Sequence, residues 1–135
     1  MKKTLKLILS VILYAWQLPQ NLLGLLLLAF YEPELSYDWK GVRLNYSPRM
    51  KGGISLGRYV ILKGSAYSAG IKPGNDEAHE YGHSRQSRIL GPLYLPLIGI
   101  PSLVHAVNWT AASPKSYYDY WTERWADKLG GVTRC

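Results

Sequence analysis

The chain has 135 residues, of which 47% are hydrophobic, and it carries a formal net charge of +7. This length suits one domain with a modest core, so a functional site must be built within a single unit or together with a partner. The only cysteine, Cys135, excludes an internal disulfide and a cysteine-based zinc cage. The basic residues lie beside apolar runs and no nucleic-acid-binding motif occurs, so the charge favours anionic lipid over nucleic acid as a partner.

Residues 1–31 predict a membrane-associated segment. A short basic head precedes an apolar run that ends at Tyr14 and resumes from Leu22. About 26 residues in all are long enough to span a bilayer core of roughly 30 Å as a helix. Four residues interrupt the apolar pattern, namely Gln17, Pro19, Gln20 and Asn21. Two structures fit this pattern: one kinked spanning helix, or two short helices that dip into one leaflet and return. A cleaved signal peptide is disfavoured, because no small-x-small cleavage site follows Tyr14.

Residues 32–135 predict a single domain that begins with a small sheet. Residues 42–47 alternate apolar and polar side chains, which is the period of a half-buried strand. Residues 54–62 are rich in β-forming side chains and predict a second strand, in which we expect Gly57 to form a bulge. Turn residues separate the two segments, and together they predict a small antiparallel sheet.

Three further segments complete the predicted α+β fold. A helix should start near Asn75 or Asp76, either of which can cap it, and end by Gly91. Residues 89–107 are apolar but broken by three prolines and Gly99, which predicts a kinked or re-entrant membrane segment, or alternatively a pair of short buried helices. A last helix is predicted from Ser113-Pro114 to the glycine pair 130–131, with an aromatic face.

The predicted helix after the sheet carries a His-Glu-x-x-His motif, which consists of His79-Glu80-Tyr81-Gly82-His83. On a helix this spacing places two imidazoles one turn apart on the same face, with a carboxylate beside them. That arrangement binds zinc and activates a water molecule. The alternative is a pair of surface histidines on an amphipathic helix.

Zinc needs a third protein ligand, and the candidates downstream are His105, Asp119, Glu123 and Asp127. Glu123 and Asp127 stand four residues apart on the predicted last helix, so both point the same way. One can then bind the metal while the other accepts the free N–H of a ligating histidine. This pairing favours Glu123 as the third ligand, with His105 as the next candidate.

The His-Glu-x-x-His motif followed by Glu123-x-x-x-Asp127 resembles the gluzincin, or thermolysin-like, branch of the zincin metallopeptidases. The resemblance implies that His79, His83 and Glu123 bind Zn²⁺, that Glu80 is the general base, and that Asp127 orients a histidine. It also implies an edge strand before the active-site helix that aligns an extended peptide substrate, for which residues 54–62 are the candidate.

These observations predict a minimal, membrane-associated zinc metallopeptidase, an endopeptidase that acts on a peptide or protein substrate with membrane lipid as a second partner. Glu80 would take a proton from the zinc-bound water and pass it to the leaving amine. An oxyanion stabiliser is also needed, and the candidates are His105, Tyr117, Tyr118 and Tyr120. The alternative is a non-catalytic metal-binding membrane protein or partner-docking module that retains the fold. A weaker third hypothesis is a basic membrane-surface adaptor without a metal.

Overall fold

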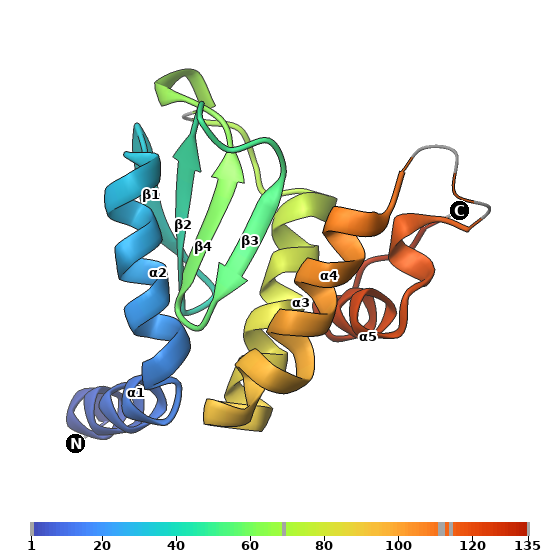
Figure 1. The fold of residues 1–135 in the computed structure, drawn as a ribbon. Coiled ribbons are helices and arrows are strands. Elements are labelled where there is room, and N and C mark those ends of the chain that lie inside the picture. The colour runs from blue at the N-terminus through green and yellow to red at the C-terminus, as the bar shows by residue number, and fades with distance from the viewer. Residues whose placement is uncertain (1, 69, 111–112, 114, 135) are drawn as a thin grey trace.

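The computed structural model describes residues 2–68, 70–110, 113 and 115–134 and has an α+β fold built on a four-stranded sheet. The elements are α1 (Lys2–Trp16), α2 (Leu18–Tyr31), β1 (Leu35–Trp39), β2 (Val42–Ser47), β3 (Gly53–Leu56), β4 (Tyr59–Lys63), α3 (Asn75–Leu90), α4 (Ile100–Asn108) and α5 (Trp121–Gly130). Helix α2 covers one face of the sheet and α3 the other, with α4 and α5 packed beyond α3 (Figure 1). The site described below is built where α3 meets α5.

The sheet has the strand order β1-β2-β4-β3 and is mixed, so the prediction of an antiparallel sheet is wrong. The pairs β1–β2 and β3–β4 are antiparallel, whereas β2 and β4 are parallel. The predicted strand over residues 54–62 is in fact two strands joined by a tight turn. Gly57 lies in this turn with a φ of 65° rather than in a bulge. The turn reverses the chain, so β4 runs in the same direction as β2 and β3 becomes the edge strand.

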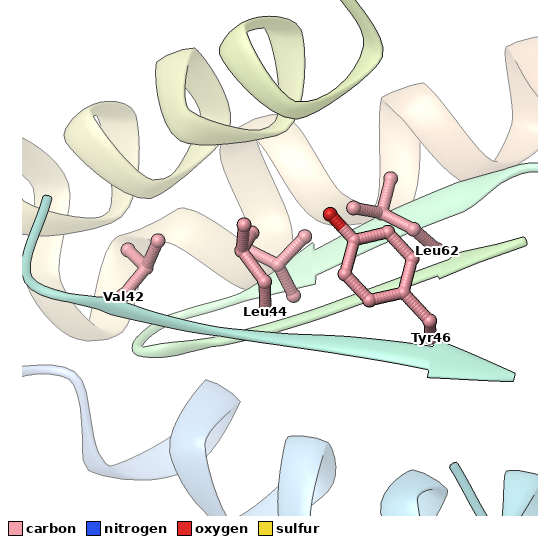
Figure 2. Packing of buried hydrophobic residues seen from close by; sticks show 5 residues of the cluster. Val42, Leu44, Tyr46 and Leu62 are labelled. Carbon is pink, nitrogen blue, oxygen red and sulfur yellow. The ribbon is translucent and has the colours of Figure 1, made fainter. Parts of the chain in front are cut away.

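The strand predicted for residues 42–47 is confirmed and its apolar face creates the core between the sheet and α3, but it is not half-buried, because Asn45 and Ser47 on the other face are buried as well. Val42, Leu44 and Tyr46 of β2 join Val60 and Leu62 of β4 in one buried cluster. Their side chains point toward α3, while α2 lies on the other side of the sheet (Figure 2). Strand β1, which was not predicted, pairs with β2 through a turn at Lys40 and Gly41, both with positive φ. Its position places a further strand beside this core.

The N-terminal segment forms two short helices that meet at an angle of 84°. Among the described residues no single helix is long and apolar enough to cross a bilayer, and α1 and α2 meet those criteria only when taken together. The polar residues at the bend are buried against the domain. Gln20 Nε2 donates to Ser87 Oγ and to the Gly91 carbonyl, both at 2.8 Å, and Ser87 Oγ donates to Gln17 Oε1 at 2.6 Å. The bend is therefore docked onto the C-terminal half of α3, and its placement in a bilayer stays a prediction.

The apolar segment after α3 is broken, as its prolines predict. A 3₁₀ turn (Gly91–Leu93) and a π-helical turn (Leu95–Gly99) precede α4, none of whose residues is buried. Its contact with a membrane stays a prediction.

The predicted ends of the two site helices are partly wrong. Helix α3 starts at Asn75, but its N-cap is Gly74, whose N–H is accepted by Glu77 Oε2 at 2.9 Å. Helix α5 starts at Trp121 rather than at Ser113-Pro114, after a 3₁₀ turn (Tyr117–Asp119). Pro114 itself lies outside the described residues. The end of α5 at Gly130, followed by Gly131 with a φ of 73°, agrees with the prediction.

Candidate metal centre

The two histidines of the motif and Glu123 converge at the crossing of α3 and α5. His79 and His83 lie one turn apart on α3, with exposed fractions of 5% and 6%, and Glu123 is 1% exposed. The Nε2 atoms of His79 and His83 lie 3.1 and 2.7 Å from Glu123 Oε2. One potential ligand atom from each of the three residues lies within 4.8 Å of the other two. The structure thus brings together the three residues predicted as metal ligands.

Two glycines allow the helices to approach closely enough for this contact. A methyl group on Gly82 of α3 would overlap the carbonyl group of Ala126 on α5. A methyl group on Gly130 of α5 would likewise overlap the carbonyl group of Ala78 on α3. Neither role was predicted, although an isolated glycine inside a helix is costly and therefore suggests a packing reason. Gly82, which directly precedes His83, is therefore part of the site through its lack of a side chain.

The remaining ring nitrogens of both histidines are held by hydrogen bonds. His79 Nδ1 donates to Asp127 Oδ1 at 2.7 Å, as the spacing of Glu123 and Asp127 predicted. His83 Nδ1 donates to Gln86 Oε1 at 2.7 Å, and Gln86 Nε2 in turn donates to the Thr122 carbonyl at 3.0 Å. Partners of this kind fix the tautomer and the direction of a ligating imidazole. Gln86 was missed, although its position three residues after His83 on the same helix face was a signal.

The charges at the crossing shift the ionisation of all three residues. Burial alone would lower the pKa of His79, but hydrogen bonds to Glu123 and Asp127 and the charge of Glu80 raise it to about 9. Burial likewise opposes charge on His83, yet its bond to Glu123 raises its pKa. For Glu123 burial favours the neutral form, but the two imidazoles hold its pKa well below its usual range. The centre therefore concentrates negative charge that protons or a cation can neutralise.

The donor set fits a transition metal such as zinc. Imidazole and carboxylate are two of the ligand types that zinc takes, and a three-residue set leaves a fourth position open. Metal–ligand distances of about 2.1 Å give tetrahedral edges of about 3.4 Å. The observed separations of 2.7 and 3.1 Å are shorter by about 0.7 and about 0.3 Å. Small side-chain movements would therefore admit the ion, although the same ligands also suit other divalent metals.

Glu80 and His79 both line a cleft of about 260 Å³ beside the edge strand β3. The cleft is lined by residues 51–53, Leu62 and Lys63 on the sheet side and by Asp76, Glu77, His79, Glu80 and Tyr118 on the other. Burial raises the pKa of the Glu80 carboxyl group, and its Oε2 has no hydrogen-bond partner among the described residues. A methyl group on Gly53 would come within 2.9 Å of Glu80 Oε1, so β3 passes directly over this carboxylate.

The four residues predicted as oxyanion stabilisers separate into two groups. The hydroxyl of Tyr117 donates to Glu123 Oε1 at 3.2 Å, and the ring of Tyr118 meets His79 edge-on at 5.1 Å between centroids. His105 instead donates from Nε2 to the Tyr117 carbonyl at 2.7 Å. Its ring stacks on those of Tyr117 and Tyr120. His105 and Tyr120 thus support the segment before α5, whereas Tyr117 and Tyr118 contact the centre itself.

Asp127 also receives a charged partner that was not predicted. Arg134 donates from Nε to Asp127 Oδ2 at 2.7 Å, and its guanidinium lies 3.3 Å from the ring centroid of Tyr118. This contact ties the residues after α5 to the carboxylate that holds His79.

No family model, curated protein or solved structure matches the chain. A function must therefore be inferred from the chemistry of this centre.

Proposed function

We propose that this protein is a zinc-dependent metallopeptidase of the gluzincin type, an endopeptidase acting at a membrane. One observation supports this proposal more strongly than any other. Two imidazole nitrogens and a carboxylate oxygen meet within 4.8 Å on two helices, beside a buried glutamate that lines a cleft. Metal-binding proteins in general need only the first part of this arrangement, whereas hydrolysis also requires the second.

In this proposal His79 and His83 would hold zinc through Nε2 and Glu123 would hold it through Oε2. Asp127 and Gln86 keep the two rings directed at the ion through the bonds to Nδ1. When bound, zinc would lower the pKa of a water molecule and polarise the scissile carbonyl group. Tyr117 holds the second oxygen of Glu123 and so favours binding through a single oxygen.

Glu80 is the residue that moves the proton. Its carboxylate follows His79 directly in the helix and borders the cleft, and Oε2 is free of protein partners among the described residues. It accepts a proton from the attacking water as the new carbon–oxygen bond forms. It then delivers that proton to the amine nitrogen as the carbon–nitrogen bond breaks. The carboxylate is regenerated, so the step balances without another reactant.

The edge strand β3 supplies a means of aligning the substrate. Strand β3 pairs with β4 on one side only, and its first residue, Gly53, lies over Glu80. An extended peptide can add to such an edge through main-chain hydrogen bonds. Tyr118 also lines the cleft. We expect the scissile bond to lie between β3 and the metal, close to Glu80.

Exposed apolar side chains support a membrane location. Such side chains occur on the helices α1, α2 and α4. They include Leu9, Ile12, Leu26, Phe30, Leu103 and Val107. Large exposed apolar surfaces on a monomer mark protein or membrane contacts. A non-catalytic metal centre in a membrane protein is the second candidate, and the burial of all three ligands favours it.

Replacing Glu80 by glutamine separates the two candidates. Glu80→Gln should keep about one zinc per chain and lower the hydrolysis of a quenched-fluorescence peptide library by about 10²–10⁴-fold, because only the proton transfer is removed. Glu77→Gln is the matched control, since Glu77 is on the same helix and lines the same cleft. Undiminished cleavage by Glu80→Gln would overturn the mechanism. A wild-type protein that binds zinc but cleaves none of the library would favour the non-catalytic centre.

A further inference from the structure

Helix α1 has a polar stripe along one side. Lys3, Lys6, Ser10 and Tyr14 follow one another at intervals of three or four residues, which places them on one side of the helix, and Gln17 continues this spacing just after its end. Two of them contact the domain. The hydroxyls of Tyr14 and Tyr59 lie 2.9 Å apart, and Gln17 Oε1 accepts from Ser87 Oγ. The C-terminal end of α1 therefore contacts the domain through Tyr14 of this stripe, and Trp16 Nε1 also donates to the Arg88 carbonyl at 3.0 Å.

The opposite side of α1 is apolar, and its side chains before Trp16 are exposed. Its residues include Leu5, Ile8, Leu9 and Ile12, each between 50% and 57% exposed. No residue of α1 is buried. An isolated helix of about 15 residues is marginal in water, since most helical stability in proteins comes from packing of an apolar face. This face therefore needs a partner that covers apolar side chains.

The charge of the segment indicates what that partner is. Residues 2–31 contain three lysines, Lys2, Lys3 and Lys6, and no acidic residue. A helix with a lysine-containing polar side and an apolar side of leucine and isoleucine is typical of the interface of an anionic bilayer. We propose that α1 lies in the plane of one leaflet of an anionic membrane, with its apolar side among the acyl chains and its lysines at the headgroups.

The bend between α1 and α2 argues against a spanning arrangement. A single span would require the two helices to straighten from their angle of 84°. Straightening would break the contact of Tyr14 with Tyr59 and the bonds that join Trp16 and Gln17 to α3. It would also place the polar side chains at the bend in hydrocarbon, where polar groups are costly. The in-plane anchor keeps every one of these bonds and is independent of whether the metal centre is catalytic.

Site-directed spin labels test whether α1 lies in the plane of the membrane. In the full chain with Cys135→Ser, single cysteines replace Ile8, Ser10 and Ile12, and each labelled protein is bound to vesicles of phosphatidylglycerol and phosphatidylcholine. The labels at positions 8 and 12 should be accessible to oxygen and protected from a water-soluble nickel chelate, and the label at position 10 should be the reverse. Depth that changes steadily along α1 without this alternation would indicate a span and overturn the proposal. Nickel access at all three positions, or spin–spin broadening between copies, would also overturn it.

Vesicle binding tests whether the lysines of α1 contribute to the attraction to an anionic membrane. The variant Lys2→Gln/Lys3→Gln/Lys6→Gln should bind vesicles that contain phosphatidylglycerol roughly 100-fold more weakly, since each lysine near an anionic surface contributes about 1 kcal/mol. The control Lys51→Gln/Lys63→Gln/Lys72→Gln removes the same charge from segments outside α1 and should change binding much less. Equal losses in the two variants would contradict the assignment to α1. Zinc content serves as a check on folding and should be the same in both.

Discussion

The crossing of α3 and α5 and the apolar side of α1 depart in opposite directions from the usual rule that apolar residues are buried and polar ones exposed. The crossing buries His79, His83 and Glu123, each with hydrogen-bond partners inside the protein. Helix α1 exposes a row of leucine and isoleucine side chains and buries none of its residues. The difference suggests that the metal centre is arranged in advance by the fold, whereas α1 depends on a surface outside the chain.

The largest expected effect comes from filling the space at the crossing. Gly82→Ala should destabilise the protein by about 3 kcal/mol or more, because the added methyl group meets the Ala126 backbone, which cannot move aside easily. Without this contact, alanine at a helix position would instead stabilise by about 1 kcal/mol. The sign of the change in the free energy of unfolding, measured in urea, therefore tests whether the helices are as close as described.

The control for this variant is another glycine near the site. Gly52→Ala adds a methyl group that meets nothing within 4 Å and should change stability by less than about 0.5 kcal/mol. A stabilised Gly82→Ala protein would mean that α3 and α5 are further apart than the proposed metal centre requires.

A smaller effect is expected from removing the partner of His79. Asp127→Ala should weaken zinc binding by about 10–100-fold, because the ring loses the acceptor that directs its Nε2 toward Glu123. Competition with a chromogenic chelator measures the affinity. Asp38→Ala is the control, since Asp38 pairs with Arg43 and Arg58 at the surface. Equal affinity in the Asp127 and Asp38 variants would remove Asp127 from the site.

The dependence on pH distinguishes protons from metal at the centre. The pKa of His79 is raised from 6.5 to about 9, so without zinc its contribution to stability is fully present below about pH 6.5 and is lost as the pH rises through 9. The thermal midpoint in chelator should therefore fall between pH 6.5 and 9. Zinc affinity should rise over the same range, because binding releases protons. A midpoint in chelator that does not fall, or falls equally in His79→Ala, would contradict the described contacts.

The parts of this fold that could be predicted from the sequence are those determined by local spacing. The period of two in residues 42–47 predicted β2, and the positions of His79, His83, Glu123 and Asp127 on their helices predicted which side chains meet. Parallel pairing of β2 with β4 could not be predicted, because it depends on the turn at Gly57 and on contacts distant in sequence.

The residues that were missed share a dependence on how two helices cross. The role of Gly82 is defined by the Ala126 carbonyl, and the orientation of Gln86 by the Thr122 carbonyl, both on α5. The late start of α5 likewise follows from the 3₁₀ turn (Tyr117–Asp119), which places Tyr117 against Glu123. Such roles appear only once the crossing is known, since no local pattern encodes the distance between α3 and α5.

The zinc content of the purified full chain tests the central claim most directly. After loading with zinc and removal of excess metal, the wild-type protein should retain about one zinc per chain, because two imidazoles and a carboxylate form a complete three-residue set. The same measurement on His79→Ala/His83→Ala should find none, while His105→Ala should retain it. Zinc that persists in the double variant, or that is absent from the wild-type protein, would contradict the metal centre.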